Sequence, residues 1–580
     1  MTSRRASALL LAGLILALMV PATASAAATT LYVDGKTGND GNTGLSATTA
    51  FKTIAKASSK IPAGSAPGWT VIVKGYTDYI YRERPVSTAF ASYGSSGAHI
   101  TWKATGYVAG TSANYVKPIV SGSDVAPAAG QSWTASNYAG VWKTPWTTEP
   151  YFFGRLTGSI KSAIFQNGTT WLWEQTSASA VATRAKTGLG GFWWDKNAKV
   201  LYVSAVAAGS ASKSPVNHKI DVIVRPTFYF KGDQGVKYVD VRGFDVRHSA
   251  NGIAFDNGTD YSVAADNVLT GNFLMGLTTA GVQTASGPNP ATGNNMSRNR
   301  GSRNTLQLIK VDEGSMNTIV CDNTAWDNAM RGILVQGRAA GTGYTGLSSG
   351  VTVCRNKLYG HDYNPSGSVY NNASGITVAN GAQKVTLDSN ESYANDVGIH
   401  VTQERSGLPA MEGIVLRYNS AHDNRRFGLN LYDGVYGTGG GHLTATKDTY
   451  WGNGTGVMVS RASTNKTLSQ VTIHDNDADG IRVGESGNPA AKLTVTKSLV
   501  TSNGGYGLWL VTGSYTTLSY VGFAGNASGS IKGTPSKTGV NTQAAGYLST
   551  TPSNANYLKI STSSYQYTAG PSHTPIGARY

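Results

Sequence analysis

Short runs of alternating apolar and polar residues recur along the chain from about Thr318 to Val511. Many have the form G-[IVL]-x-[VL], such as GILV at Gly332, GITV at Gly375 and GIHV at Gly398. A period of two over so few residues predicts half-buried β-strands. No amphipathic segment of helical length interrupts these runs, so the pattern predicts an all-β region.

A turn that contains asparagine follows the strands at a nearly regular interval. The equivalent positions are 33, 34, 29, 29 and 28 residues apart, and they are Asn323, Asn356, Asn390, Asn419, Asp448 and Asn476. Self-similarity at such a period is typical of a solenoid. Each coil would pair with the coils above and below it, roughly 4.8 Å away. We therefore predict a right-handed parallel β-helix with an inward ladder of turn asparagines.

The same alternation predicts which side chains face outward. In the recurring run the two apolar residues that flank x point inward, and x points outward. The first outward row is then Gln307, Leu334, Thr377, His400, Asn430, Met458, Arg482 and Trp509. The second lies two residues on and comprises Ile309, Gln336, Ala379, Thr402, Tyr432 and Ser460. We expect a binding groove on this strand face.

Other segments depart from the repeat. Residues 1–26 combine a basic start, an apolar stretch and an Ala-Ser-Ala site, which predicts a secretory signal and a secreted protein without a membrane partner. The β-helix is expected over residues 27–528, opening with a short helix before Ala57 that caps the solenoid. A tryptophan-rich β subdomain with a hairpin at Asn197 is inserted at about 126–214, and coils resume at Ile220. Residues 529–580 are expected to form a C-terminal cap.

Charge and cysteine content refine this prediction. The net charge of +16 comes with only 14% charged residues, and no basic block or nucleic-acid motif is present. This charge either serves general solubility or attracts a polyanion, and we expect a monomer that binds no nucleic acid. Cys321 and Cys354 each lie two residues before an equivalent asparagine. They should be stacked neighbours that can form a disulfide in an oxidising compartment.

Four segments carry a resemblance to a known group. They are LYVDGKTGNDGNTG at Leu31, GFWWDKNAKVLYV at Gly191, VDVRGFDVRHSANGI at Val239 and PIGARY at Pro575. Together they resemble secreted bacterial β-helix proteins of the pectate-lyase superfamily, over nearly the whole mature chain. The resemblance implies carbohydrate processing, usually of a polysaccharide. The group includes lyases, glycosidases and epimerases, so the fold does not choose the reaction.

The first hypothesis is β-elimination on a uronic-acid polymer. This reaction needs a cation near the carboxylate, a base for the α proton and an acid for the leaving oxygen. The segment around Lys310 is similar to the strand with the catalytic lysine in the alginate-lyase and chondroitinase B family. That similarity implies Lys310 as the base, with Arg331 or Arg338 as its partner. Neither the calcium-binding glutamates of that family nor an aspartate cluster is found, so we expect a mechanism without a metal or other cofactor, although calcium stays an option.

A second group of candidates lies further along the outward rows. His400 and Tyr432 should project from neighbouring strands and can serve as base and acid in a lyase or a C5-epimerase. Glu404 and Asp433 follow just past the same strand ends. The expected substrate-binding residues are Gln336, Glu404, Asn430, Asp433 and Arg482.

Two other classes of function stay open. Glu404 and Asp433 could approach the roughly 5–5.5 Å separation of a retaining glycosidase pair, with Asp312 and Glu313 as a weaker pair. A non-catalytic carbohydrate-binding protein could use Trp509, Tyr432, Met458 and the tryptophan-rich insert. For each cluster the plain alternative is a set of solvated side chains on a β surface. We favour a secreted polysaccharide lyase that cleaves an acidic polysaccharide.

Overall fold

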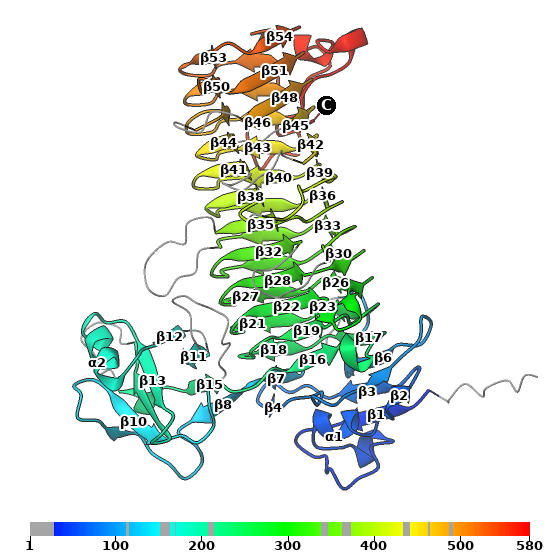
Figure 1. Ribbon diagram of the computed structural model, residues 1–580, viewed down its shortest axis with the longest axis vertical. Coiled ribbons are helices and arrows are strands. Elements are labelled where there is room, and N and C mark those ends of the chain that lie inside the picture. The colour runs from blue at the N-terminus through cyan, green and yellow to red at the C-terminus, as the bar shows by residue number, and fades with distance from the viewer. Residues whose placement is uncertain are drawn as a thin grey trace, which may run out of the picture.

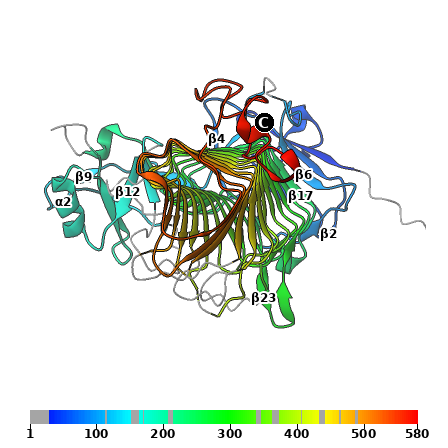
Figure 2. The same cartoon turned by 90° about the horizontal axis from the view of Figure 1, so that it is seen from above.

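The protein is a column of stacked β coils. The computed structural model describes residues 28–111, 115–150, 163–168, 170–206, 214–337, 346–361, 373–405, 407–432, 441–461, 465–485 and 491–579. Three long parallel sheets run along the column (Figure 1) and enclose one core when viewed from above (Figure 2). The fold is a right-handed parallel β-helix, as the repeat predicted. The expected signal segment lies outside the described residues, and none of the described helices is long and apolar enough to cross a membrane.

One of the three sheets carries the outward rows and is called the site sheet. It has twelve strands. In spatial order they are β16 (Phe228–Lys231), β19 (Ile253–Asp256), β22 (Met275–Ala280), β28 (Gln307–Asp312), β32 (Arg331–Gln336), β35 (Ser374–Ala379), β38 (Val397–Thr402), β41 (Phe427–Tyr432), β44 (Thr455–Ser460), β47 (Ile481–Val483), β50 (Tyr506–Leu510) and β53 (Gly529–Lys532). A fifteen-stranded sheet runs from β1 (Thr30–Val33) to β54 (Ser536–Thr538), and a thirteen-stranded sheet from β4 (Ile80–Arg82) to β52 (Gly522–Ala524).

In-register pairing stacks like residues on like residues in the core. Ile309, Ile333, Ile376 and Ile399 occupy one row of successive site-sheet strands, and all four are fully buried. The prediction that Ile309 faces outward is therefore wrong. The error arises because Leu308 occupies the position of the glycine with which the repeated run begins in later coils. Without that glycine the inward and outward positions of this coil were assigned one residue out of step. Lys310, and not Gln307, lies in the outward row beside Leu334.

Two buried polar ladders run through the turns. The first comprises Asn267, Asn299, Asn323, Asn356, Asn390, Asn419 and Asp448. The second comprises Asn272, Asn304, Asn328, His361, Asn395, Asn424, Asn453, Asn476, Asn503 and Asn526. The ladder expected from the sequence is thus present, but Asn476 belongs to the second one. The two ladders were merged because each coil carries two turns of similar sequence.

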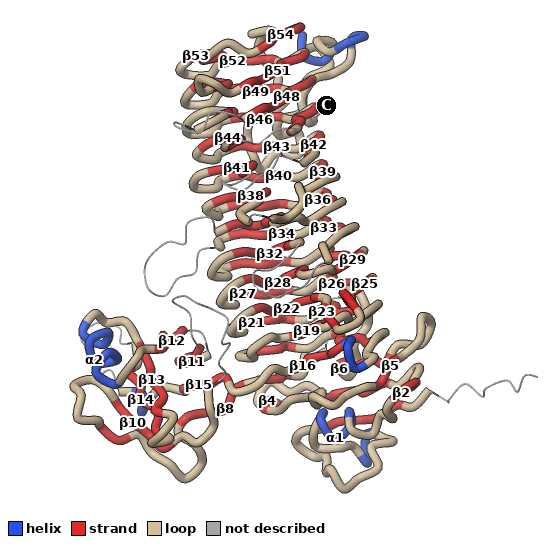
Figure 3. The backbone as a smooth tube through the Cα atoms, viewed as in Figure 1, coloured by secondary structure: helices blue, strands red, loops and turns tan. Residues whose placement is uncertain are grey.

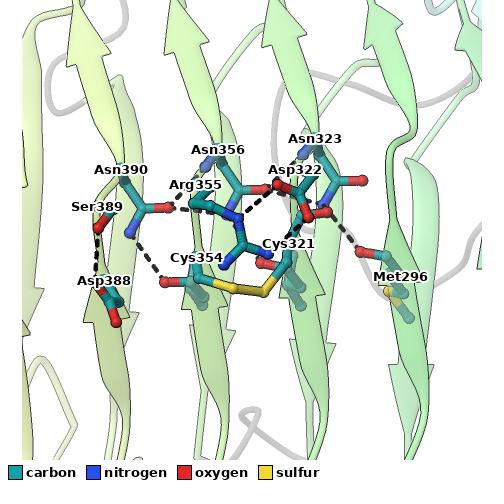
Figure 4. Close-up of a disulfide and its surroundings, with 12 residues drawn as sticks. Met296, Cys321, Asp322, Asn323, Cys354, Arg355, Asn356, Asp388, Ser389 and Asn390 are labelled. Carbon is teal, nitrogen blue, oxygen red and sulfur yellow. Dashed lines mark hydrogen bonds and ion pairs between the residues drawn. A yellow bond between two sulfur atoms is a disulfide. The ribbon is translucent and has the colours of Figure 1, made fainter. Parts of the chain in front are cut away.

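Each rung of a ladder makes several hydrogen bonds, as Figure 4 shows for three coils. The Oδ1 of Asn390 accepts from both the backbone N–H and the Nδ2 of Asn356, at 3.1 and 2.9 Å. Its Nδ2 donates to Val353 O and to the Oδ1 of Asn419, both at 2.9 Å. Buried polar groups of successive coils are thereby satisfied by one another.

The predicted disulfide is confirmed. Cys321 in β30 (Ile319–Cys321) pairs in register with Cys354 in β33 (Thr352–Cys354), and their Cα atoms are 4.5 Å apart. Figure 4 shows the bridge beside the first ladder. The adjacent Arg355 forms an ion pair with Asp322 at 2.8 Å, so the same two coils are also joined electrostatically.

The N-terminal helix and the insert differ in part from the prediction. The helix α1 (Ile54–Ser58) has only five residues and buries Ile54 and Ala57 in the main core; that it closes the solenoid stays a prediction. The strand β15 (Ile220–Ile223) pairs antiparallel with β8 (Ser123–Ala126) in the sheet of the insert. Coils therefore resume at β16, and not at Ile220, because the chain first completes that sheet.

The insert has an eight-stranded sheet and the helix α2 (Ala178–Lys186). Its predicted hairpin is confirmed as β13 (Gly191–Asp195) and β14 (Val200–Ser204). Trp171 of the insert packs in one apolar cluster with Phe273, Leu274 and Ala329 of the coils. Figure 3 shows the insert as a separate lobe beside the lower coils. This contact lies next to the start of the site sheet's strands β22 and β32.

The coils also continue past the expected boundary at residue 529. Strands β53 and β54 still pair in parallel with the preceding coils. Beyond them the chain folds back, and Ala545, Ile560 and Ile576 pack on Leu499 of the thirteen-stranded sheet. The C-terminal segment therefore covers the side of the last coils.

The ladder hydrogen bonds should contribute measurably to stability. Asn390→Ala leaves the N–H groups of Asn356 and the carbonyl of Val353 without their partner, and each buried unsatisfied group costs about 1–3 kcal/mol. We expect a destabilisation of about 2–4 kcal/mol in thermal unfolding. The exposed Asn137→Ala should leave the unfolding temperature unchanged. Equal unfolding temperatures for both variants would contradict a stabilising ladder.

The terminal rung of the first ladder should make stability depend on pH. Burial raises the pKa of Asp448 to about 7, above that of an unfolded aspartate. The folded state then binds an extra proton between about pH 4 and 7, so stability falls as pH rises through this window. The side chain in Asp448→Asn stays neutral at every pH. The free energy of unfolding of this variant, relative to that of the parent protein, should therefore rise by roughly 1–3 kcal/mol from pH 5 to pH 8. Identical profiles, or an equal effect of the exposed Asp477→Asn, would contradict this account.

Candidate functional site

Strand register places polar side chains in one line along the outer face of the site sheet. This line is called the central row, and its members are Tyr229, Ala254, Thr278, Lys310, Leu334, Thr377, His400, Asn430, Met458, Arg482, Trp509 and Lys532. The predicted substrate-binding residues Asn430 and Arg482 are among them. Gln336 and Tyr432 lie in the second outward row, two residues further along their strands.

His400 lies near the middle of the central row, between Thr377 and Asn430. Its side chain meets Tyr432 of the next strand, with ring centroids 6.5 Å apart in an edge-to-face arrangement. The structure therefore brings these two predicted residues together. His400 is only 2% exposed, and neither ring nitrogen has a hydrogen-bond partner in the described parts of the chain. Buried imidazoles normally satisfy at least one nitrogen, so two unsatisfied ring nitrogens mark this position as unusual.

Arg331 lies close to His400. Its Nε donates to Thr377 Oγ1 at 3.1 Å, and the Thr377 hydroxyl is also 2.6 Å from Ser374 Oγ. The guanidinium is half-buried and forms no ion pair with any described carboxylate. Burial lowers its pKa, and the nearest opposing charge acting on it is that of Glu404. A partly buried and unpaired cation is costly, which makes this position a candidate site for an anion.

The surroundings keep His400 neutral. Burial, together with the positive charges of Arg331 and Arg426, lowers its pKa to about 3. The fully buried carboxylate of Asp396 is shared by Arg426 and Arg425, at 2.6 and 2.7 Å. An anion bound at Arg331 would cancel part of this positive field and raise the pKa of His400. The pKa of His400 therefore depends on the charges beside it.

Tyr432 is held as a proton donor. Burial raises its pKa above the ordinary value. The guanidinium of Arg461 lies 4.8 Å from the centre of its ring and 3.9 Å from Glu485. Glu404 is exposed and accepts a long hydrogen bond of 3.4 Å from Thr402. The phenol is therefore protonated at neutral pH, next to a neutral imidazole.

Lys310 is engaged by an acid of its own strand. Its ammonium group forms an ion pair with Asp312, whose other oxygen is buried without a partner. Asp256 lies two coils before Asp312 in the second outward row, and it accepts a hydrogen bond of 2.5 Å from Tyr229. Burial raises the pKa of Asp256. The N-terminal part of the face is therefore an acidic cluster around one lysine.

The remaining predicted residues have different standings. Arg338 and Asp433 lie outside the described residues, so their roles stay predictions. The sequence did not lead us to predict the ion pair between Arg426 and Asp396. Arg426 follows Asn424, a member of the second ladder, by two positions, so this spacing could have indicated the pair. In the described ranges no three His, Cys, Asp or Glu side chains converge as metal ligands.

Comparison with known proteins concerns the fold. Residues 368–520 match the family model described as a right-handed beta helix region. No curated protein matches the chain. The structure of XylC in complex with xylose is similar over 88% of this chain and 86% of that chain, with 14% identity and a TM-score of 0.49.

Two further solved structures show the same likeness. A glycoside hydrolase is 9% identical over 73% of this chain and 96% of that chain, with a TM-score of 0.45. The A-module of the Azotobacter vinelandii mannuronan C-5 epimerase AlgE4 is 17% identical over 53% of this chain and 83% of that chain, with a TM-score of 0.40. The assignment of the fold as a right-handed parallel β-helix rests on the three long parallel sheets and on the family model.

Proposed function

We propose that this protein is an exported enzyme that cleaves an acidic polysaccharide by β-elimination. The observation that carries the proposal is that Arg331, which pairs with no acid of the described ranges, lies near His400, whose ring nitrogens both lack a hydrogen-bond partner among the same residues. The first can receive a carboxylate and the second can receive a proton. Both requirements meet in a uronate sugar, where the proton to be removed is α to the carboxylate.

In the proposed reaction the uronate carboxylate binds at Arg331. Its negative charge is neutralised there, which makes the α proton more acidic. The same charge offsets the field that depresses the pKa of His400, so the imidazole becomes a stronger base as the substrate binds. His400 takes the α proton and a C=C bond forms. The glycosidic C–O bond breaks, and Tyr432 donates its proton to the leaving oxygen.

Of the two bases that the sequence suggested, Lys310 and His400, we select His400. The ammonium of Lys310 is occupied by Asp312, whereas His400 has two free ring nitrogens. We propose that Gln336, Asn430 and Lys310 contact sugar hydroxyl or carboxylate groups on either side of the reacting unit. A C5-epimerase would share the first proton transfer and would return a proton to the opposite face without cleavage.

Substitution at His400 tests the proposal. With alginate, glucuronan, pectate and glycosaminoglycans as a panel, cleavage is followed by the ultraviolet absorbance of the unsaturated uronate product. His400→Ala should lower kcat/KM by roughly 10²–10⁴-fold, because it removes the base. Lys310→Ala should retain most of the kcat. The control is His442→Ala, whose imidazole is 74% exposed on a loop and should not affect the rate.

The opposite result would overturn the assignment. Full activity of His400→Ala together with loss of activity in Lys310→Ala would identify Lys310 as the base. No unsaturated product from any polymer of the panel would contradict β-elimination itself.

A second candidate function is glycoside hydrolysis, and a specific pair of acids favours it. Asp256 and Asp312 lie two coils apart in one outward line, so their backbones are roughly 10 Å apart. Inverting glycosidases separate their two carboxyl groups by roughly 6.5–9.5 Å. Burial raises the pKa of Asp256, as suits an acid, and the free oxygen of Asp312 suits a base. The pair of Glu404 and Asp433 predicted from the sequence remains an alternative for the same reaction.

Hydrolysis has a distinct signature. If it is the reaction, new reducing ends should form without ultraviolet absorbance, and Asp312→Asn should lower kcat by at least roughly 100-fold. His400→Ala would then retain activity. If Asp312→Asn changes the rate less than threefold, these acids only form the ion pair with Lys310.

A further inference from the structure

Three successive strands near the C-terminal end of the site sheet carry a cluster that the proposed reaction does not use. Arg482 in β47, Trp509 in β50 and Lys532 in β53 are in-register neighbours of the central row. The guanidinium carbon of Arg482 is 4.2 Å from the ring centre of Trp509, and the ammonium of Lys532 is 4.0 Å from it. One cation comes from the preceding coil and the other from the following coil, so they cover opposite faces of the indole.

This geometry excludes one role that the sequence suggested for Trp509. A sugar ring stacks on the open face of an aromatic ring, and both faces of this indole are occupied by cations. Trp509 instead holds two positive charges at fixed positions through cation–π contacts. Lys532 also lies 5.3 Å from the ring centre of Tyr506, which restrains the same ammonium from a second side.

Neither cation is neutralised by an ion pair with a described carboxylate. The nearby Asp479 uses one oxygen to accept a hydrogen bond from the backbone of Tyr506 at 2.9 Å, and it is 96% buried. The Nε of Arg482 is buried without a hydrogen-bond partner, while Lys532 is exposed. Two fixed and unpaired positive charges that face outward form a site for an anionic group.

The position of the cluster relates it to the reaction site. Between His400 and the cluster, the central row contains Asn430 and Met458. Lys532 lies five coils from His400, which is roughly 24 Å along the column. Along this path Asn430 and Met458 are each only 5% exposed, whereas Lys532 at its end is exposed. A single sugar unit cannot span that distance, whereas a polymer can.

We propose that Arg482, Trp509 and Lys532 form a remote subsite that binds a carboxylate-bearing unit of the same polysaccharide chain that reaches His400. This inference rests on the proposed function for the identity of the polymer, but not for the binding itself. The indole positions the two cations, and the cations bind the carboxylate. The subsite makes the enzyme favour long chains over short ones.

The test compares polymer and trisaccharide binding by titration calorimetry, with alginate, polygalacturonate and glucuronan as probes. The double variant Arg482→Gln with Lys532→Gln should bind the preferred polymer roughly 3- to 30-fold more weakly and the trisaccharide unchanged. Raised salt should remove most of the difference between the double variant and the parent protein. In activity assays the double variant should show a higher KM for polymer with the same kcat.

Lys492→Gln is the matched control. Lys492 also lies over an aromatic ring, 5.8 Å from the centre of Tyr515, but it belongs to the fifteen-stranded sheet. Lys492→Gln should leave polymer binding unchanged. Neither Lys492→Gln nor the double variant should change the unfolding temperature. Polymer binding that is equally strong in the double variant, or the absence of binding to all three polymers by the parent protein, would overturn the inference. Weakened binding by the double variant without any elimination by the parent protein would support the subsite and contradict only the proposed reaction.

Discussion

The structure depends on the exact alignment of each coil with the next, and the buried asparagine ladders enforce it. At the asparagine rungs a backbone N–H and a side-chain amide of one coil donate to a side-chain oxygen of the following coil, as at Asn390 and Asn419, while at His361 a ring nitrogen accepts from the backbone N–H of Asn328. A slip of one residue would break these bonds and would also turn the isoleucine row out of the core. Because apolar burial and buried hydrogen bonding demand the same register, the outward rows are determined as strictly as the inward ones. The positions of His400, Arg331 and Lys532 follow from this alignment.

The outer face of the site sheet changes in character along the column. At its N-terminal part Lys310 pairs with Asp312, in the middle Arg331 pairs with no acid of the described ranges, and at the C-terminal part Arg482 and Lys532 share one indole. A cation without an acid is tolerated in a protein when it serves a ligand or a reaction. The uneven pairing of charges along one face therefore supports an anionic polymer that lies across the middle and C-terminal coils. The neutral His400, which we propose as the base, lies beside Arg331 on this face.

Much of the fold could be predicted from the sequence, because the repeat and the period of two both report directly on the backbone. The prediction failed where one residue broke the pattern. Leu308 replaces the usual glycine and displaced Ile309 and Lys310 by one position, and the two similar turns of each coil concealed that Asn476 belongs to the second ladder. The strand at Ile220 was assigned to the coils because an apolar run does not specify its partner. The antiparallel neighbour β8 becomes apparent only in three dimensions.

The candidate site could be predicted less completely. That His400 and Tyr432 face outward on adjacent strands follows from alternation, and the structure bears it out. Alternation shows which side chains share a face, but it does not show which of them form ion pairs. That Asp312 pairs with Lys310, and that no described acid pairs with Arg331, became apparent only in the structure. These pairings favour His400 over Lys310 as the proposed base.

The most direct measurement is a crystal structure of the His400→Ala variant with a bound oligouronate of the preferred polymer. The account predicts a sugar carboxylate on the guanidinium of Arg331. The α carbon of that unit should face the space vacated by the imidazole, and the Tyr432 hydroxyl should lie within hydrogen-bond distance of the glycosidic oxygen. A sugar bound between Asp256 and Asp312, with Arg331 unoccupied, would contradict the account and favour hydrolysis.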